Sequence, residues 1–376
     1  PHAPHIENDP IVSPNVCANV RERSGEVSRV DDPQIPGGHA QRWLRAEDEG
    51  AARKPITSKD GRAPTVADKR RARPATLRTI ADHVGVHVTT VSKVLNGSDA
   101  VARQAASTDT VERIREAATK LGYRPNPHAT SLRTSRSNLI GVLVPRLSDI
   151  VLATIYEGIE ARANELGLST FVTNSYDVPD NQRARTTMML NRRVDGLIFG
   201  DARYDAAFVD SVAAQNVPFV LVSRHAGAHP SVTCDDFRGG WLAGQHLAEL
   251  GHRDVAVAAG ADYASTAIDR TAGFVAAMKE YGVRVTRSQI VYTSFDAAGG
   301  RAAGAKIVAR KRRPTAIFAT NDFAAIGVMG AIQAAGLRPG EDISVVGYND
   351  TPLAANIVPP LTTVRSPMFE MGQQAV

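Results

Sequence analysis

Polar side chains on one short predicted helix have the chemistry that suits a nucleic acid. In the segment from Val88 to Leu95, the apolar residues Val91, Val94 and Leu95 recur on one side. Hydroxyls, an amide and one cation occupy the other side, where they can hydrogen-bond to base edges in a major groove and to phosphates. The outward residues are Thr89, Thr90, Ser92, Lys93 and Asn96.

Two further helices would position this polar face. Thr76 can cap a helix whose apolar residues recur every three or four positions up to Val84, and Gly85 then ends it. A third apolar stripe from Thr108 to Leu121 would close a three-helix core. Two short helices joined by a glycine turn predict a helix-turn-helix. An ordinary helical hairpin with a polar face is the alternative.

From Asn138 onward the sequence alternates between apolar strand-length runs and helical stretches. Runs that are apolar on both faces and separated by helices predict parallel sheets covered on both sides. The predicted strands are Leu139–Val144, Thr170–Thr173, Val194–Phe199, Pro218–Val222, Asp254–Ala259, Ile290–Thr293, Thr315–Thr320 and Ile343–Tyr348. The predicted helices are Thr154–Leu166, Gly239–Leu250, Ala267–Tyr281, Ala297–Arg310 and Phe323–Ala335.

Polar residues close to the ends of these strands are candidates for ligand binding. Parallel α/β sheets place ligands at the carboxyl ends of their strands, so these side chains should meet at one cleft. For each of them, a helix cap or a surface loop is the alternative role. The candidates are Asp149, Ser223, Arg224, Asp235, Asp236, Arg270, Phe295, Asn321, Asp322 and Asn349.

Two stretches carry a specific resemblance. VTTVSKVLNGS (Val88 to Ser98) and LGYRPNPHATSLRTSRSNLIGVLVP (Leu121 to Pro145) resemble the LacI/GalR family of bacterial transcription regulators. The resemblance implies a multidomain protein, with an all-α helix-turn-helix head joined to an α/β two-lobed sensor like the periplasmic binding proteins. It implies that the second helix contacts operator bases and that a hinge helix follows it, with a leucine that wedges between base steps.

The resemblance also assigns roles to individual residues. Val88, Thr89 and Lys93 match base-contacting positions. Asn126 and Ala129 match the hinge and Leu132 the wedge, while Thr76 and Arg133 complete the expected DNA contacts. In the sensor, Arg270 and Asn349 match effector contacts, and Phe295 matches an aromatic position that packs on a sugar. Asn349 and Ser223 stand where acids are common, which favours a neutral hydroxyl-rich or an anionic ligand over a cation.

The sequence departs from the family pattern at further places, Thr79 among them, where an acidic residue is common. His87 occupies the position of a capping serine, so that helix start should be weaker by roughly 1 kcal/mol. About five extra residues separate Asn96 from Ser107, with Ala100–Ala105 as the expected insert. Met368–Val376 begins a helix after which the family continues, so we expect a truncated second lobe with an exposed sheet edge.

The 376 residues, 43% of them hydrophobic, allow several domains. We predict a disordered extension over residues 1–73, the helix-turn-helix domain over 74–123, the hinge segment over 124–137 and the effector-binding domain over 138–376. Residues 74–137 hold nine Lys and Arg against five Asp and Glu, which places the positive charge where phosphate binding needs it.

Several protein classes are not supported. The sequence has no nucleophile elbow, dinucleotide fingerprint or Walker motif, so we expect no enzyme and no cofactor. Cys17 and Cys234 lack the number and spacing of a disulfide framework or zinc site. No apolar run is long enough to span a membrane and no secretory signal opens the chain, so we expect a soluble cytoplasmic protein.

We therefore predict a sequence-specific DNA-binding regulator, a repressor controlled by a sugar-like small molecule. It would act as a homodimer on a near-palindromic double-stranded operator. Two alternatives remain open: a solute-binding protein for uptake or chemoreception, and a regulator whose effector is a protein co-regulator.

Overall fold

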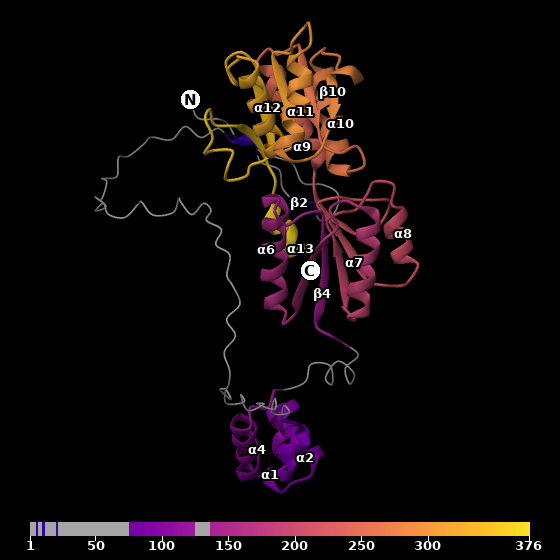
Figure 1. The fold of residues 1–376 in the computed structure, drawn as a ribbon, viewed down its shortest axis with the longest axis vertical. Helices are drawn as coiled ribbons and strands as arrows, with labels where there is room; N and C mark the ends of the chain where they lie inside the picture. The colour runs from indigo at the N-terminus through magenta and orange to yellow at the C-terminus, as the bar shows by residue number, and fades with distance from the viewer. Residues whose placement is uncertain (1–4, 7–9, 12–19, 22–74, 125–135) are drawn as a thin grey trace, which may run out of the picture. The chain divides into compact units, whose positions relative to one another are not determined.

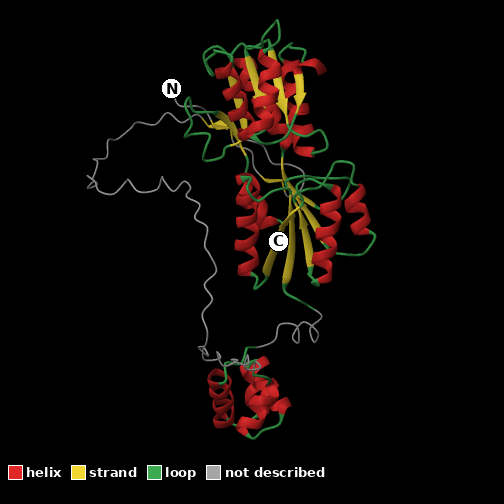
Figure 2. Cartoon of the chain, viewed as in Figure 1, coloured by secondary structure: helices red, strands yellow, loops and turns green. Residues whose placement is uncertain are grey.

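The computed structural model describes residues 75–124 and 136–376, and the backbone of residues 5–6, 10–11 and 20–21 (Figure 1). One compact unit is Gly25–Pro127, and the other combines Pro1–Ser24 with His128–Val376. The first unit is helical in its described part, and the second contains two α/β lobes (Figure 2). The predicted multidomain architecture is thereby confirmed. None of the described helices is long and apolar enough to cross a membrane.

The helical unit, which we call the head, packs short helices around one apolar core. The Thr76 hydroxyl accepts a hydrogen bond from the Thr79 amide at 3.2 Å and so starts the first helix. Gly85 has a φ of 76°, a left-handed conformation that glycine adopts without strain, and it ends that helix. The helices are α1 (Leu77–Val84), α2 (Val88–Asn96), α3 (Asp99–Ala105) and α4 (Thr108–Lys120).

The segment expected as an insert forms helix α3. The Ser98 hydroxyl caps it by accepting from the Val101 amide at 3.4 Å. Ala102 is only 1% exposed and belongs to the core of the head. Arg115 on α4 pairs with Asp99 at 2.7 Å. The insert therefore extends the head core and is not a free loop.

The first lobe is built on a sheet in the order β2-β8-β7-β6-β4-β5, in which β4 to β8 are all parallel. Its strands are β2 (Pro10–Ile11), β4 (Leu139–Val144), β5 (Ser169–Asn174), β6 (Gly196–Phe199), β7 (Phe219–Val222) and β8 (Ser231–Cys234). Its helices are α6 (Ile150–Glu165), α7 (Pro179–Asn191), α8 (Ala207–Ala213) and α13 (Met368–Gln374).

The second lobe has the sheet order β10-β9-β11-β12-β13-β1-β3. Its strands are β1 (His5–Ile6), β3 (Val20–Arg21), β9 (Val255–Ala259), β10 (Ile290–Tyr292), β11 (Ala316–Ala319), β12 (Ser344–Asn349) and β13 (Thr362–Arg365). Its helices are α9 (Asp236–Glu249), α10 (Ser265–Glu280), the 3-10 turn η1 (Arg287–Gln289), α11 (Ala297–Val308) and α12 (Asp322–Ala334).

Within residues 136–376 the chain passes between the lobes twice, from β8 to α9 and from β13 to α13. Helix α13 returns to the first lobe and packs on α6 so closely that a Cβ on Gly372 would overlap the backbone oxygen of Ile155. One apolar cluster includes Ile155 of the first lobe and Phe274 and Phe318 of the second. The two lobes therefore share part of their core near the crossings.

The outer edge of β13 is paired, so the expectation of an exposed edge there is wrong. His5 and Ile6 of β1 lie parallel to Thr363 and Val364. In the first lobe, β2 pairs antiparallel with β8. Strands β1, β2 and β3 also fall within the 1–73 segment for which the sequence predicted disorder, and the rest of that segment lies outside the described residues.

Close helix packing around Gly240 gives a stability prediction. A Cβ at Gly240 on α9 would overlap the backbone oxygen of Arg270 on α10. We expect Gly240→Ala to lower the free energy of unfolding by about 1–3 kcal/mol, although alanine is the better helix former. The measurement is urea denaturation of the full chain.

Gly196→Ala is the matched control, because its Cβ would lie 3.5 Å from the Pro218 oxygen, an ordinary contact. Its effect should stay within about 0.5 kcal/mol. Equal losses in the two variants would contradict the packing argument.

Candidate ligand cleft and nucleic-acid interface

A cavity of about 350 Å³ lies between the two lobes, at the carboxyl ends of their strands. Both lobes contribute side chains to its lining, as the parallel-sheet argument requires. Charged, amide and aromatic groups occur together, which suits a small molecule with several hydrogen-bonding groups. The predicted candidates that line it are Asp149, Ser223, Arg224, Arg270, Phe295, Asn321 and Asn349.

Three predicted candidates do not line the cavity, because other groups hold their carboxylates. Asp235 caps α9 by accepting from the Arg238 amide at 2.7 Å. Asp236 accepts from Arg270 Nε at 2.7 Å. Asp322 is buried and accepts from the Thr363 hydroxyl at 2.5 Å and the Thr351 amide at 2.7 Å. Their predicted placement in the cleft is corrected accordingly.

Burial raises the pKa of Asp322 to about 6, while its hydrogen bonds with Thr363 and Thr351 oppose that shift. These bonds join the start of α12 to β13 and to the loop after β12. The carboxylate therefore holds the second lobe together behind the cleft.

Arg270 is presented to the cavity in a fixed orientation. Besides its bond to Asp236, it donates from Nη1 to the Thr320 carbonyl at 2.7 Å, and its guanidinium carbon lies 3.7 Å from the centroid of the Tyr348 ring. Burial opposes the charge, but Asp236, Tyr348 and Cys234 together outweigh burial, and the pKa of Arg270 is raised. The group is therefore a permanent cation at the floor of the cleft.

Arg224 carries the positive charge on the side of the first lobe. It forms a bidentate pair with Asp177 at 2.8 and 3.1 Å. Its guanidinium carbon lies 5.8 Å from the Tyr263 ring centroid and 5.6 Å from that of Phe295, both residues of the second lobe. Cation–π contacts at this range favour approach of the lobes.

Asn349 offers an unused acceptor. It is 3% exposed, and no group in residues 75–124 or 136–376 donates a hydrogen bond to its Oδ1. A buried amide oxygen without a donor costs about 1–3 kcal/mol, which a ligand hydroxyl could recover. Asn321 differs, because it accepts from the Ala324 amide and donates to the Phe295 carbonyl, both at 2.7 Å. Asn321 thus positions the aromatic residue.

Asp149 has a double role. It caps α6 by accepting from the Val151 amide at 3.0 Å, and it also lines the cavity. Burial raises its pKa despite this hydrogen bond and the nearby charges of Arg224 and Arg146. Asp149 therefore has both positions that the sequence allowed for it, a helix cap and a side chain in the cleft.

The sequence prediction missed several polar lining residues. Most of them follow a strand, as Asp177 follows β5 and Tyr263 follows β9, so the strand-end rule could have found them. The chief omissions are Arg146, Tyr176, Asp177, Tyr263, Thr266 and Asp296.

Polar contacts join the two lobes beside the cavity. His225, after β7, lies with Nε2 2.7 Å from Asp269 Oδ2 on α10, and its amide donates to the Ser265 hydroxyl at 2.9 Å. The Tyr204 amide donates to the Tyr263 carbonyl at 2.8 Å. These bonds hold the cleft closed on one side.

No metal chemistry is indicated in the part of the chain that the structure describes. Among those residues, no three His, Cys, Asp or Glu side chains are grouped as metal ligands would be.

The polar face predicted on α2 is present on the head. Val91 and Val94 are buried, while Thr89, Lys93 and Asn96 are exposed and Val88, Thr90 and Ser92 are half-buried. Thr76 is exposed at the start of α1. Asn126, Ala129, Leu132 and Arg133 lie outside the described residues.

His87 replaces the expected serine cap with an imidazole. Its Nδ1 accepts from the Thr89 amide at 3.4 Å and lies 2.8 Å from the Thr89 hydroxyl. The start of α2 is therefore capped, at the long end of hydrogen-bond distance.

Asp195 anchors the beginning of the first lobe. Its carboxylate accepts from the amides of Ser137 and Asn138, both at 2.8 Å, and from the Ser137 hydroxyl at 2.9 Å. Burial opposes the carboxylate charge, but these bonds outweigh it and lower the pKa of Asp195. The chain segment that leads into β4 is thus fixed at its sensor end.

Residues 76–126 match the family described as bacterial regulatory proteins, lacI family, and residues 245–376 match a periplasmic binding protein-like domain. The transcriptional regulator DegA of Bacillus subtilis is 32% identical over 80% of this chain and 88% of its own length. The transcriptional repressor PurR of Erwinia tasmaniensis is 34% identical over 80% of this chain and 88% of its own.

Two solved structures are similar to this chain. A lac repressor dimer bound to operator and an anti-inducer is 31% identical, with a TM-score of 0.73 over 81% of this chain and 91% of that one. A complex of the transcriptional regulator CelR with cellobiose is 27% identical, with a TM-score of 0.59 over 80% of this chain and 90% of that one.

The His225–Asp269 pair predicts a pH dependence. Its hydrogen bond to Asp269 raises the pKa of His225 against the effect of burial. A raised pKa means that the stabilisation is fully present below the ordinary histidine value of about 6.5 and is lost as the pH rises through the raised value. Both side chains are partly exposed, so we expect the pair to contribute at most about 1 kcal/mol to the free energy of unfolding.

The measurement is urea denaturation of the full chain at pH 6 and pH 8.5. Asp269→Asn should remove most of the difference in unfolding free energy between the two pH values. If the variant and the unaltered protein respond equally to pH, the pair contributes nothing.

Proposed function

The chain belongs to the lacI family of bacterial regulatory proteins, and from this premise we propose that it is a transcriptional repressor released from its operator by a small hydroxyl-rich molecule. The observation that carries the proposal is the interlobe cavity, into which the second lobe presents a fixed guanidinium and an amide oxygen without a donor. The head supplies the DNA contacts and the cavity supplies their control.

The chemistry of the cavity favours a neutral ligand. Its lining holds three arginines and three aspartates, so a strongly charged molecule would face as much repulsion as attraction. The Asn349 oxygen can accept from a hydroxyl, and Arg270 and Arg224 can donate to one. Tyr263 and Phe295 offer apolar ring faces. A sugar combines hydroxyls with apolar faces, and the related CelR is described in complex with cellobiose.

A homodimer on a near-palindromic operator is part of the proposal. The similar lac repressor structure is described as a dimer bound to operator. Two heads related by a twofold axis would place two α2 helices in successive major grooves. The predicted hinge residues, including the Leu132 wedge, would act between the two half-sites.

Control follows from lobe closure. A ligand held by both lobes favours the closed cleft, and the Asp195 anchor would pass the resulting movement of the first lobe to the segment before β4. Changing operator occupancy from 99:1 to 1:99 needs about 5.5 kcal/mol of differential ligand binding between the two states.

Lys93 tests the DNA interface. It is exposed on α2 and forms no ion pair within the described residues. We expect Lys93→Ala to cost roughly 1–3 kcal/mol of operator affinity, concentrated at one base pair, if it contacts a base. Fluorescence anisotropy with a set of single-substitution operators measures this.

Lys120→Ala, at the end of α4, is the control with the same change of charge. A uniform loss across all operators for Lys93→Ala would assign the lysine to phosphate contact. Equal losses of operator affinity for the two variants would mean that both lysines contribute only non-specific electrostatic attraction to DNA.

Asn349 tests the cleft. A panel of mono- and disaccharides, cellobiose included, is screened by thermal shift, and the affinity of any stabilising sugar is measured by calorimetry. Asn349→Gly should weaken that sugar by roughly tenfold, the effect of losing one buried hydrogen bond. Glycine tolerates the φ of 107° at this position, so backbone strain is not added.

Asn216→Gly is the control, since Asn216 also has a positive φ, of 55°, and is exposed away from the cavity. No response to any sugar, with operator binding intact, would point to a protein co-regulator. Loss of operator binding in the unaltered chain would instead favour a solute-binding protein.

A further inference from the structure

A second cavity, of about 550 Å³, opens at the other end of the second lobe. Its lining comes from residues at or before the starts of β9, β10 and β11, whereas the second lobe lines the interlobe cleft with residues that lie beyond the ends of these parallel strands. The two cavities share no lining residue.

Charge distinguishes this second cavity, which we call the arginine cavity. Its lining contains five arginines and a single acidic residue. The arginines come from three separate loops, so the fold and not one basic stretch of sequence brings them together. The charged residues are Arg253, Arg284, Arg310, Arg312, Arg313 and Asp254.

Backbone carbonyls orient several of these guanidinium groups without neutralising them. Arg310 Nη2 donates to the Ser288 carbonyl at 2.8 Å, and Arg313 Nε donates to the Val308 carbonyl at 2.8 Å. Arg253 Nη1 donates to the Ala248 carbonyl at 2.9 Å. Each bond uses one nitrogen of the planar fork, which leaves other N–H groups of the same side chain to point elsewhere.

Asp254 compensates only part of the positive charge of the five arginines. Arg312 pairs with Asp254 at 2.7 Å. Within the described ranges, 75–124 and 136–376, Arg253, Arg284, Arg310 and Arg313 form no ion pair. Four positive charges therefore converge on one concave surface, an arrangement that a bound anion would stabilise.

The rest of the lining narrows the class of anion. Thr286 and Ser288 add hydroxyls and Gln289 an amide, but none of the described residues that line the arginine cavity is aromatic. It thus lacks a ring on which a nucleobase could stack. Guanidinium forks match phosphate oxygens in bidentate geometry. From this we propose that the arginine cavity binds a compact polyphosphate, with pyrophosphate as the smallest member of the class.

The test is calorimetric titration of the full chain with pyrophosphate at fixed ionic strength, because exposed charges are screened by salt. Arg284→Gln and Arg310→Gln should each weaken binding by about tenfold, the effect of losing one charge-assisted contact. Arg284 is exposed and has no hydrogen bond within the described residues, so its replacement leaves the fold intact. Melting temperatures without pyrophosphate check both variants.

Arg287→Gln is the matched control. Arg287 lies on η1 in the same loop as Arg284, is exposed and does not line the arginine cavity. The net charge changes equally, yet binding should weaken by less than about twofold, because diffuse attraction is small at physiological salt. Asn349→Gly in the interlobe cleft should leave pyrophosphate affinity unchanged, which separates this site from the proposed function.

Four results would overturn the assignment. One is the absence of pyrophosphate binding to the unaltered chain, and another is an equal loss for Arg287→Gln and Arg284→Gln. The third is inorganic phosphate binding as tightly as pyrophosphate, which would mean that a single phosphate suffices. The fourth is ATP binding more than tenfold more tightly than pyrophosphate, which would mean that a base contributes.

Discussion

Asp236 and Arg270 form an ion pair of 2.7 Å in which the side chains are 3% and 5% exposed. Removing two such charges from water costs several kcal/mol for each ion, and the pair persists only if further polar contacts accompany it. Thr320 supplies a carbonyl, Tyr348 an aromatic face and Cys234 a thiol that donates to Asp236 at 3.3 Å. The cleft side of the second lobe is organised by these contacts.

The partners of this ion pair come from different elements, and each has a role in the cleft. Asp236 begins α9 directly after the chain crosses from the first lobe, and Thr320 directly follows β11. Tyr348 immediately precedes Asn349, whose side-chain oxygen has no hydrogen-bond donor among the described residues. Displacing the guanidinium would therefore shift the crossing, two strand ends and a candidate ligand group together. Gly240 permits the helix approach that makes the pair possible.

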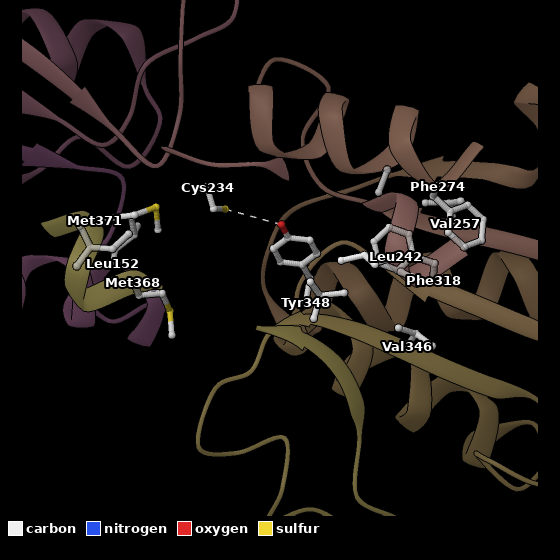
Figure 3. Packing of buried hydrophobic residues seen from close by; sticks show 14 of the residues in the cluster. Leu152, Cys234, Leu242, Val257, Phe274, Phe318, Val346, Tyr348, Met368 and Met371 are labelled. Carbon is white, nitrogen blue, oxygen red and sulfur yellow. Dashed lines mark hydrogen bonds between the residues drawn. The ribbon is translucent and has the colours of Figure 1, made fainter. Parts of the chain in front are cut away.

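Cys234 lies at the lobe crossing, and its surroundings keep the thiol unreactive. Its thiol lies 3.7 Å from the Tyr348 hydroxyl, which points toward it in Figure 3. Burial, helped by the charge of Asp236, raises the pKa of this thiol to about 12. The protonated sulfur is a weak nucleophile and packs like a small apolar group between the lobes.

The fold was predictable from sequence where burial produces a clear period. The run Leu139–Val144 coincides with β4, and Val88–Leu95 differs from α2 by one residue. Helix α7 has no such signal, because its buried residues include Gln182 and Thr186 besides Met189. Helix α3 was not predicted for another reason: a seven-residue helix with one buried alanine has too few apolar positions to show a period.

Candidate ligand residues were predictable as far as topology decides them. Arg224 lies after β7, Asn349 is the last residue of β12, and α10 carries Arg270 to the same cavity. Position could not decide how each carboxylate is used, because that depends on partners distant in sequence. Asp322 lies near a strand end, as Asn349 does, but its oxygens are occupied by Thr351 and Thr363.

The same topology separates two electrostatic environments in the second lobe. Residues 138–376 hold 22 Lys and Arg against 23 Asp and Glu, so neither cavity owes its charge to a general excess. Parallel strands send the loops that follow them to the cleft and those that precede them to the arginine cavity. Strand β9 has 5 residues, which at about 3.3 Å each span about 16 Å. At physiological salt, charges that lie farther apart than about 8 Å are largely screened from one another. The arginine cavity can therefore keep an uncompensated charge while the charges of the cleft stay balanced for a neutral ligand.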